Sequence, residues 1–177
     1  MRLGRDFYLM PATKAAPLLC GKLLCVRGTD GAVTKRRITE TECYFGEEDT
    51  ACHAHHGRTK RTETLYSEGG VAYVYLCYGI HDLLNVITGE RDHPEGVLIR
   101  GVEGANGPGK LTKLIGIDRS FNAYSFIDSD VIWCEDDGFS PELEASPRIG
   151  IAYAEKADRE RLWRFTVKDT HPKGQRK

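Results

Sequence analysis

"KLLCVRGTDGAVTKRRITETECYF", residues 22–45, decides the fold because it predicts a long β-hairpin on which the rest of the chain can be built. Two strand-like runs flank Asp30-Gly31, a dipeptide suited to a two-residue turn whose central residues tolerate positive φ. Side chains alternate between the two faces of a strand. One face of the second strand should therefore carry Ile38, Glu40, Glu42 and Tyr44, and the other Thr39, Thr41 and Cys43.

Further strands are predicted along the chain. β-Rich runs on either side of Tyr78-Gly79, in "GGVAYVYLCYGIHDLLNVITG" (residues 69–89), predict a second hairpin. "EGVLIRGVEG" (residues 95–104) predicts the next strand. "PRIGIAY" (residues 147–153) and "WRFTV" (residues 163–167) predict late strands. The middle of the protein is thus expected to be an antiparallel sheet.

Helices are predicted at three places. Apolar spacing favours a helix within residues 6–22, with Gly21 as its end signal, and Pro108 opens another in residues 107–117. Residues 157–163 favour a third. The predicted fold class is therefore mixed α/β (α+β), a single domain over residues 1–177 with a disordered tail at residues 170–177.

Composition is that of an ordinary folded chain of 177 residues, with 29% charged and 40% hydrophobic residues. The sequence contains no apolar run of the roughly 20 residues that a membrane helix needs, so a cytoplasmic location is expected. The six cysteines form no CxxC pair and are expected to be reduced. Acidic residues gather in residues 128–144, which leaves the remainder of the chain net positive.

The stretch "ETECYFGEEDTACHAHH", residues 40–56, carries most of the candidate chemistry. Its cysteines and histidines allow a zinc site, although their spacing matches no standard pattern. Glu47, Glu48 and Asp49 resemble a solvated turn, whereas Glu40 and Glu42 lie in a strand. A buried glutamate needs a partner or a function, so the residues alone leave open a salt-bridged structural role or a general base.

"GANGPGKL", residues 104–111, resembles a phosphate-binding loop of the GxxxxGK type. Leu111 stands where a serine or threonine should hold magnesium, and Pro108 removes a backbone N–H from the loop. Nucleotide hydrolysis is therefore excluded, while the start of the helix is kept as an anion contact.

The aromatic run "YVYLCYG", residues 73–79, predicts either sheet packing or a surface on which nucleobases stack. Tyr78 differs from the others because a ring beside glycine at a hairpin tip tends to project. Projecting side chains can wedge into a DNA duplex.

Together these motifs resemble the alkyladenine (3-methyladenine) DNA glycosylase family. The resemblance runs from near Phe7 to about Val167. It is carried, in order, by "ETECYFGEEDTACHA", "YVYLCYGIHDLLNV", "GVLIRGVEG", "GPGKLTKLIGIDRSFN" and "PRIGIAY". It implies a curved antiparallel sheet, similar to the barrel of a formyltransferase C-terminal domain, with a hairpin that enters the minor groove.

The resemblance also implies roles for individual residues. Glu42 would activate the attacking water, helped by Arg100 and the backbone carbonyl of Ile149. Tyr44 and Tyr75 would sandwich a flipped base. The His53 ring would complete the stack, and its carbonyl would read the purine edge. Asn85 would line the pocket floor and reject normal guanine, Tyr78 would fill the gap in the duplex, and Arg58, Lys60, Arg61 and Lys110 would contact DNA.

The resemblance implies a monomer that acts on damaged purines in double-stranded DNA, associated with the nucleoid when it does so, with no metal, cofactor or membrane. After Gly57-Arg58 the family usually continues with an arginine-asparagine pair, whereas this chain has Thr62 and Glu63 in that segment. A non-catalytic damage-binding relative of the same fold therefore remains the alternative to a glycosylase.

Overall fold

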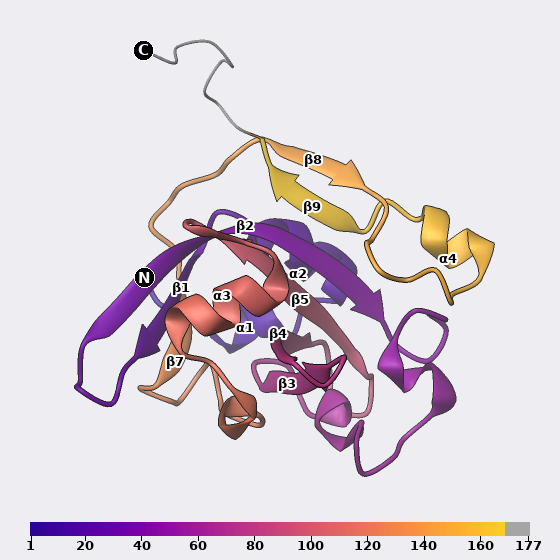
Figure 1. Cartoon of the computed structure of the whole chain (residues 1–177), viewed down its shortest axis with the longest axis horizontal. Coiled ribbons are helices and arrows are strands. Elements are labelled where there is room, and N and C mark those ends of the chain that lie inside the picture. The colour runs from indigo at the N-terminus through magenta and orange to yellow at the C-terminus, as the bar shows by residue number, and fades with distance from the viewer. Residues whose placement is uncertain (169–177) are drawn as a thin grey trace.

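The computed structural model describes residues 1–168, which fold around one strongly curled antiparallel sheet (Figure 1). Its spatial order is β3-β4-β5-β2-β1-β7, with β6 paired to β5 and β9 lying between β2 and β8. The strands are β1 (Leu23–Arg27), β2 (Val33–Phe45), β3 (Ala72–Cys77), β4 (His81–Thr88), β5 (Glu95–Val102), β6 (Ala105–Asn106), β7 (Ile132–Glu135), β8 (Leu143–Ser146) and β9 (Arg164–Val167). The predicted fold class is confirmed.

Helices cover this sheet, and Figure 1 shows α1 and α2 behind it and α3 in front. They are α1 (Arg5–Tyr8), α2 (Ala12–Leu19), α3 (Pro108–Ile115) and α4 (Lys156–Glu160), with 3-10 turns η1 (His53–His56), η2 (Glu63–Tyr66) and η3 (Arg119–Phe121). Pro108 opens α3 as predicted. The helix predicted within residues 6–22 is confirmed as α2, which begins after Pro11 and ends just before Gly21, and α1 precedes it as a separate short helix. The disordered tail predicted at residues 170–177 lies outside the described residues.

The β1–β2 hairpin is confirmed, with Leu23 paired to Arg37 and Arg27 to Val33. The last strand pair of this hairpin is Arg27 with Val33, so residues 28–32 form the connection. This connection is longer than the predicted two-residue turn. Gly31 adopts a positive φ of 81°. Asp30 does not, and its carboxylate instead accepts a hydrogen bond from the Ala32 N–H at 3.0 Å.

A bulge near Thr39 determines which side chains of β2 face the core. The register between β2 and β5 shifts between Ile38 and Glu40, and again between Glu40 and Thr41. An extra residue in a strand reverses the faces of the side chains that follow. Ile38 therefore packs in the main core with Cys43, and its predicted position beside Glu40 and Glu42 is wrong.

The late part of the chain differs most from prediction. Residues 147–153 were expected to form a strand but form an irregular loop between β8 and α4. β7 and β8, which fall largely within the acidic segment, were not predicted. The expected strand at residues 163–167 is confirmed by β9, which pairs with both β2 and β8. The expected helix at residues 157–163 ends at Glu160.

The main core lies between the sheet and its helices, with members such as Leu19, Leu84 and Leu111. Each such fully buried aliphatic side chain contributes about 1.5–3 kcal/mol. A smaller cluster underlies one end of the sheet and supports Tyr44 and Tyr75. The cysteines are all free, and only Cys77 is more than slightly exposed. Within the described residues, no helix is both long and apolar enough to span a membrane.

Gly69 provides a test of the packing that holds β3 in place. A Cβ at this position would lie 2.0 Å from the carbonyl oxygen of Tyr8. The backbone cannot easily retreat, because the Gly69 N–H donates to Gly89 and the Gly89 N–H donates to Tyr8. Gly69→Ala should lower the free energy of unfolding by about 1–3 kcal/mol in urea denaturation, the usual cost of overpacking. Gly4→Ala, with nothing within 4 Å of the new methyl group, is the control. Equal stability of the two variants would contradict this account.

Candidate active site

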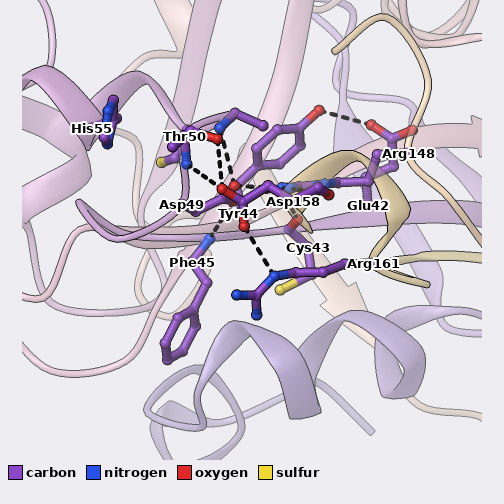
Figure 2. A network of polar contacts seen from close by, with 12 residues as sticks. Glu42, Cys43, Tyr44, Phe45, Asp49, Thr50, His55, Arg148, Asp158 and Arg161 are labelled. Carbon is purple, nitrogen blue, oxygen red and sulfur yellow. Dashed lines mark hydrogen bonds and ion pairs between the residues drawn. The ribbon is translucent and has the colours of Figure 1, made fainter. Parts of the chain in front are cut away.

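Glu42 lies in β2 with its side chain fully buried. Its Oε1 accepts a hydrogen bond from the Ile149 N–H at 2.8 Å, and its Oε2 accepts one from the Tyr44 hydroxyl at 2.9 Å. Figure 2 shows the Tyr44 ring extending to this carboxylate. Burial raises the pKa of Glu42, while the Ile149 N–H, Arg100 and Tyr44 oppose that rise. The site therefore holds a carboxylate that is more basic than usual and fixed in orientation.

Glu40 takes the other role that the sequence left open for a buried glutamate. Its Oε1 lies 3.0 Å from Nε of Arg100 and 2.8 Å from Nη1 of Arg164. Nε of Arg100 is also 3.6 Å from Oε1 of Glu42. Glu40 is thus a salt-bridged carboxylate that holds Arg100 beside Glu42.

A cavity of about 820 Å³ opens next to these residues. Such a volume suits a ligand the size of a nucleoside. A smaller cavity of about 40 Å³ adjoins the larger one. The two cavities share Tyr44, His53 and Tyr75 in their linings. Asn85 borders the smaller one, and Arg100, Ile149, Tyr78, Arg61 and Lys110 border the larger one.

Three aromatic side chains meet at the cavity. The centroid of the His53 ring in η1 lies 4.5 Å from that of Tyr75 in β3. Its Nδ1 lies 3.1 Å from the Tyr73 hydroxyl. Burial and the neighbouring Arg61 lower the pKa of His53, so the imidazole is neutral at neutral pH. In β4, the Asn85 amide donates to the Tyr73 carbonyl at 3.2 Å and is thereby fixed.

Tyr78 occupies the tip of the β3–β4 hairpin and is 87% exposed, as expected for a projecting ring. Its backbone is held at a positive φ of 50°, which is uncommon for a tyrosine. The predicted projection of this ring is therefore present, and the ring also lines the cavity.

The predicted DNA-contacting cations divide into two groups. Arg61 and Lys110 line the cavity, whereas Arg58 and Lys60 do not. Nη2 of Arg58 lies 2.6 Å from Glu63, and its Nη1 lies 2.7 Å from Asp92. These carboxylates offset the Arg58 charge. A DNA contact by Arg58 stays a prediction, one that must compete with two ion pairs.

Thr62 has a structural role. It is buried, accepts from the Thr59 N–H at 2.8 Å and donates to the Gly57 carbonyl at 3.1 Å. It therefore shapes the loop that presents Lys60 and Arg61.

The sequence did not reveal Arg148 and Asp49, which form a buried ion pair beside Tyr44. The expectation that Asp49 lies in a solvated turn is wrong, because this residue is only 2% exposed. Tyr153 was also missed. It lines both cavities and donates from its hydroxyl to the Ala51 carbonyl. The only local signal for Arg148 is its position next to Ile149 in the segment that was predicted to be a strand.

The zinc alternative is not supported by this geometry. Cys43 points into the core, while His53 faces the cavity and contacts Tyr73. Nδ1 of His55 lies 2.8 Å from the Glu47 carbonyl. Across residues 1–168, no three His, Cys, Asp or Glu side chains gather in a way that could hold a metal ion.

Comparison with known proteins identifies the family. The family model described as methylpurine-DNA glycosylase (MPG) matches residues 6–105 and 103–171. The chain belongs to this family. The resemblance that the sequence motifs indicated is therefore confirmed.

Relatives in this family align over nearly their whole length. A Clostridium perfringens (strain SM101 / Type A) protein is 42% identical over 200 residues, covering 96% of this chain and 97% of the relative. A Borrelia garinii protein is 41% identical over 180 residues, covering 94% and 96%. One from Psychrobacter cryohalolentis is 42% identical over 196 residues, covering 94% and 92%. Each is named "Putative 3-methyladenine DNA glycosylase".

The raised pKa of Glu42 predicts how stability depends on pH. Between the pKa values of the unfolded and folded chains, the folded protein binds more protons, so stability falls as pH rises through the folded value. Glu42→Gln removes this titration. It should raise the free energy of unfolding by about 1 kcal/mol above that window, a size common when a strained site residue is replaced.

The measurement is urea denaturation at about pH 8 and about pH 4, because the advantage of Glu42→Gln should shrink once the parent carboxyl is protonated. Glu48→Gln, at an exposed position, is the control and should change stability by less than about 0.5 kcal/mol. If Glu42→Gln were more stable than the parent by the same amount at both pH values, the pKa of Glu42 would not be raised by folding.

Proposed function

We propose that this chain is a monofunctional DNA glycosylase that flips alkylated or deaminated purines out of duplex DNA and hydrolyses their N-glycosidic bond. The substrate class is that of 3-methyladenine, 7-methylguanine, hypoxanthine and ethenoadenine, and the product is an abasic site. The observation that carries the proposal is a buried, oriented Glu42 behind a cavity flanked by Tyr44, His53 and Tyr75. Membership of the methylpurine-DNA glycosylase family and the names of the relatives support it.

In this reaction Glu42 acts as the general base. The bond from the purine nitrogen to C1′ of the sugar breaks, and its electrons leave with the base. A water oxygen bonds to C1′, and its proton passes to the Glu42 carboxylate. General bases contribute roughly 10²–10⁴-fold to such steps. The guanidinium of Arg100 lies 3.6 Å from Oε1 of Glu42. Its positive charge helps to keep the Glu42 carboxylate ionised before the reaction. No metal or cofactor is needed for any of these steps.

The aromatic side chains account for recognition of the base. An alkylated purine can carry a positive charge, which strengthens stacking on the electron-rich rings of Tyr44 and Tyr75. The lowered pKa of His53 matters here, since a neutral imidazole does not repel a cationic base. In this proposal Asn85, held by its bond to the Tyr73 carbonyl, disfavours the exocyclic amine of guanine.

DNA binding is assigned to the rim of the cavity and to Lys60 in the adjoining loop. Tyr78 fills the space that the flipped nucleotide leaves, and Lys60, Arg61 and Lys110 contact phosphates. No residue of the acidic segment 128–144 lines the cavity, which is compatible with a DNA path that avoids its charge.

The decisive test is single-turnover incubation with a duplex that carries one hypoxanthine, and separately with methylated DNA, in excess EDTA. The parent should release the base and leave DNA that is cut only after alkali treatment. Glu42→Gln should bind the lesion duplex but excise it at least about 100-fold more slowly, since it lacks the general base. If the parent bound the lesion without excising any base, the non-catalytic alternative would replace this proposal.

The role of Tyr78 predicts a loss of lesion affinity in Tyr78→Ser. Stacking of a ring in a duplex is worth about 1–3 kcal/mol, so binding to a hypoxanthine duplex should weaken about 10-fold in a fluorescence titration. Tyr124→Ser is the matched control, because Tyr124 is an exposed tyrosine outside the cavity lining. Equal affinities of Tyr78→Ser and the parent would rule out the wedge.

The ion pairs of Arg58 predict that Glu63→Gln tightens DNA binding. Loss of this carboxylate frees part of the Arg58 charge, so the slope of log affinity against log salt should steepen by about one unit. Glu68→Gln, which removes the partner of Arg5 in a similar surface pair, is the control. A salt slope identical to that of the parent would mean that Arg58 stays away from phosphate even when released.

A further inference from the structure

The N–H group that binds Glu42 belongs to a segment without regular secondary structure. Ile149 lies in the loop between β8 and α4, where strand pairing does not fix the backbone. Ile149 is 46% exposed as a residue, and Gly150 follows with a positive φ of 77°. Something other than the sheet must therefore hold the Ile149 N–H at 2.8 Å from Oε1 of Glu42.

Arg148, one residue earlier, makes the contacts that can do so. Its guanidinium is fully buried and forms two bonds with the Asp49 carboxylate, of 2.6 and 2.8 Å. Nη1 also donates to the Cys43 carbonyl at 2.9 Å, and Nη2 donates to the Asp158 carbonyl at 3.3 Å. Arg148 thereby ties its own loop to the residue that follows Glu42 in β2 and to α4.

The same guanidinium also touches the aromatic side of the site. It lies 4.8 Å from the centroid of the Tyr44 ring, whose hydroxyl donates to Oε2 of Glu42. Asp49, the ion-pair partner of Arg148, is itself held in place. Its carboxylate accepts hydrogen bonds from the N–H groups of Phe45 and Ala51, at 3.1 Å each. Figure 2 shows Asp49 and Arg148 among the residues grouped around Glu42 and Tyr44.

We propose that Arg148, clamped by Asp49, is a positioning residue for the general base: it holds the Ile149 N–H and the Tyr44 ring in place on the two oxygens of Glu42. The effect on excision rests on the proposed function, whereas the effect on Glu42 does not. Arg148 does not touch the reacting atoms in this assignment.

A purely structural ion pair is the competing explanation. Buried ion pairs add little net stability, because the cost of removing both charges from water offsets their attraction. Nε of Arg148 is also buried without a hydrogen-bond partner among the described residues, which is unfavourable for a group kept for stability alone. These two points favour a positioning role.

The chain offers a matched control at Arg37. This arginine also forms two bonds with one carboxylate, of 3.1 and 2.8 Å to Asp137, and donates to the carbonyl of Gly21. Its guanidinium lies 4.5 Å from the Phe139 ring. Arg37 lies outside the cavity lining. Arg37→Lys therefore disrupts the same kinds of contact as Arg148→Lys, but at a site away from Glu42.

The experiment compares Arg148→Lys, Asp49→Asn and Arg37→Lys with the parent. Lysine keeps the charge of Arg148 but cannot reproduce its forked bonds. The first readout is the pKa of the Glu42 carboxyl in the DNA-free protein, by carbon NMR titration of labelled glutamate, with Glu42→Gln identifying the signal. The second is the single-turnover excision rate of hypoxanthine as a function of pH, with thermal unfolding as a check on folding.

We expect Arg148→Lys and Asp49→Asn to raise the pKa of Glu42, because the carboxylate loses well-placed donors. The acid limb of the excision rate should move to higher pH in the same variants. The rate near neutrality should fall about 10-fold to 100-fold. Arg37→Lys should match the parent in all of these. If the parent excised nothing while the pKa of Glu42 still rose in the variants, the proposed function would fail and the positioning role would stand.

Two results would overturn the positioning role. One is a folded Arg148→Lys or Asp49→Asn protein in which the pKa of Glu42 is that of the parent. The other is unfolding of both variants while Arg37→Lys stays folded, which would assign the pair to stability alone.

Discussion

The burial of one carboxylate, Glu42, is the constraint on which the site depends. A charged group removed from water must be stabilised by fixed donors, or else it takes up a proton and cannot act as a base. The chain supplies these donors from three places: Tyr44 from the same strand, Arg100 from β5, and the Ile149 N–H from the loop after β8. The curled sheet brings these segments to one place beside the cavity.

This arrangement explains why two similar glutamates on one strand behave differently. The Glu40 carboxylate pairs with two arginines and anchors them. Burial instead raises the pKa of Glu42, and the Ile149 N–H, Arg100 and Tyr44 oppose that rise. The bulge near Thr39 puts both on the side away from the main core and leaves Ile38 in it. A regular strand would have placed Ile38 and Glu42 on the same face.

Much of the scaffold could be predicted from local sequence. Both hairpins and the helix opened by Pro108 depend on residues close in the chain, and the exposed position of Tyr78 follows from its place at a turn. The resemblance to a known family pointed to Glu42 among several carboxylates, which composition alone could not do. The side chains that pair with one another in the site were harder to predict from sequence. Arg148 and Asp49 are 99 positions apart, and nothing in either local stretch indicates the other.

The two segments whose structure was predicted wrongly, residues 147–153 and the turn at Asp30, also depend on contacts that local sequence does not reveal. The loop at residues 147–153 has the apolar content of a strand, but its backbone is held by side-chain bonds rather than by strand pairing. The turn at Asp30 is longer than its dipeptide suggests, because the Asp30 carboxylate bonds to the backbone within the loop. Bulges and side chain to backbone bonds leave no periodic signal, so these features emerged only in three dimensions.

The most direct test of the central claim is a crystal structure of Glu42→Gln bound to a duplex with one ethenoadenine. The account predicts that the damaged base lies in the cavity between Tyr44 and Tyr75, with the substituted side chain toward C1′ of its sugar and Tyr78 in the gap of the duplex. A lesion that stays stacked in the helix, or a flipped base bound away from residue 42, would contradict it.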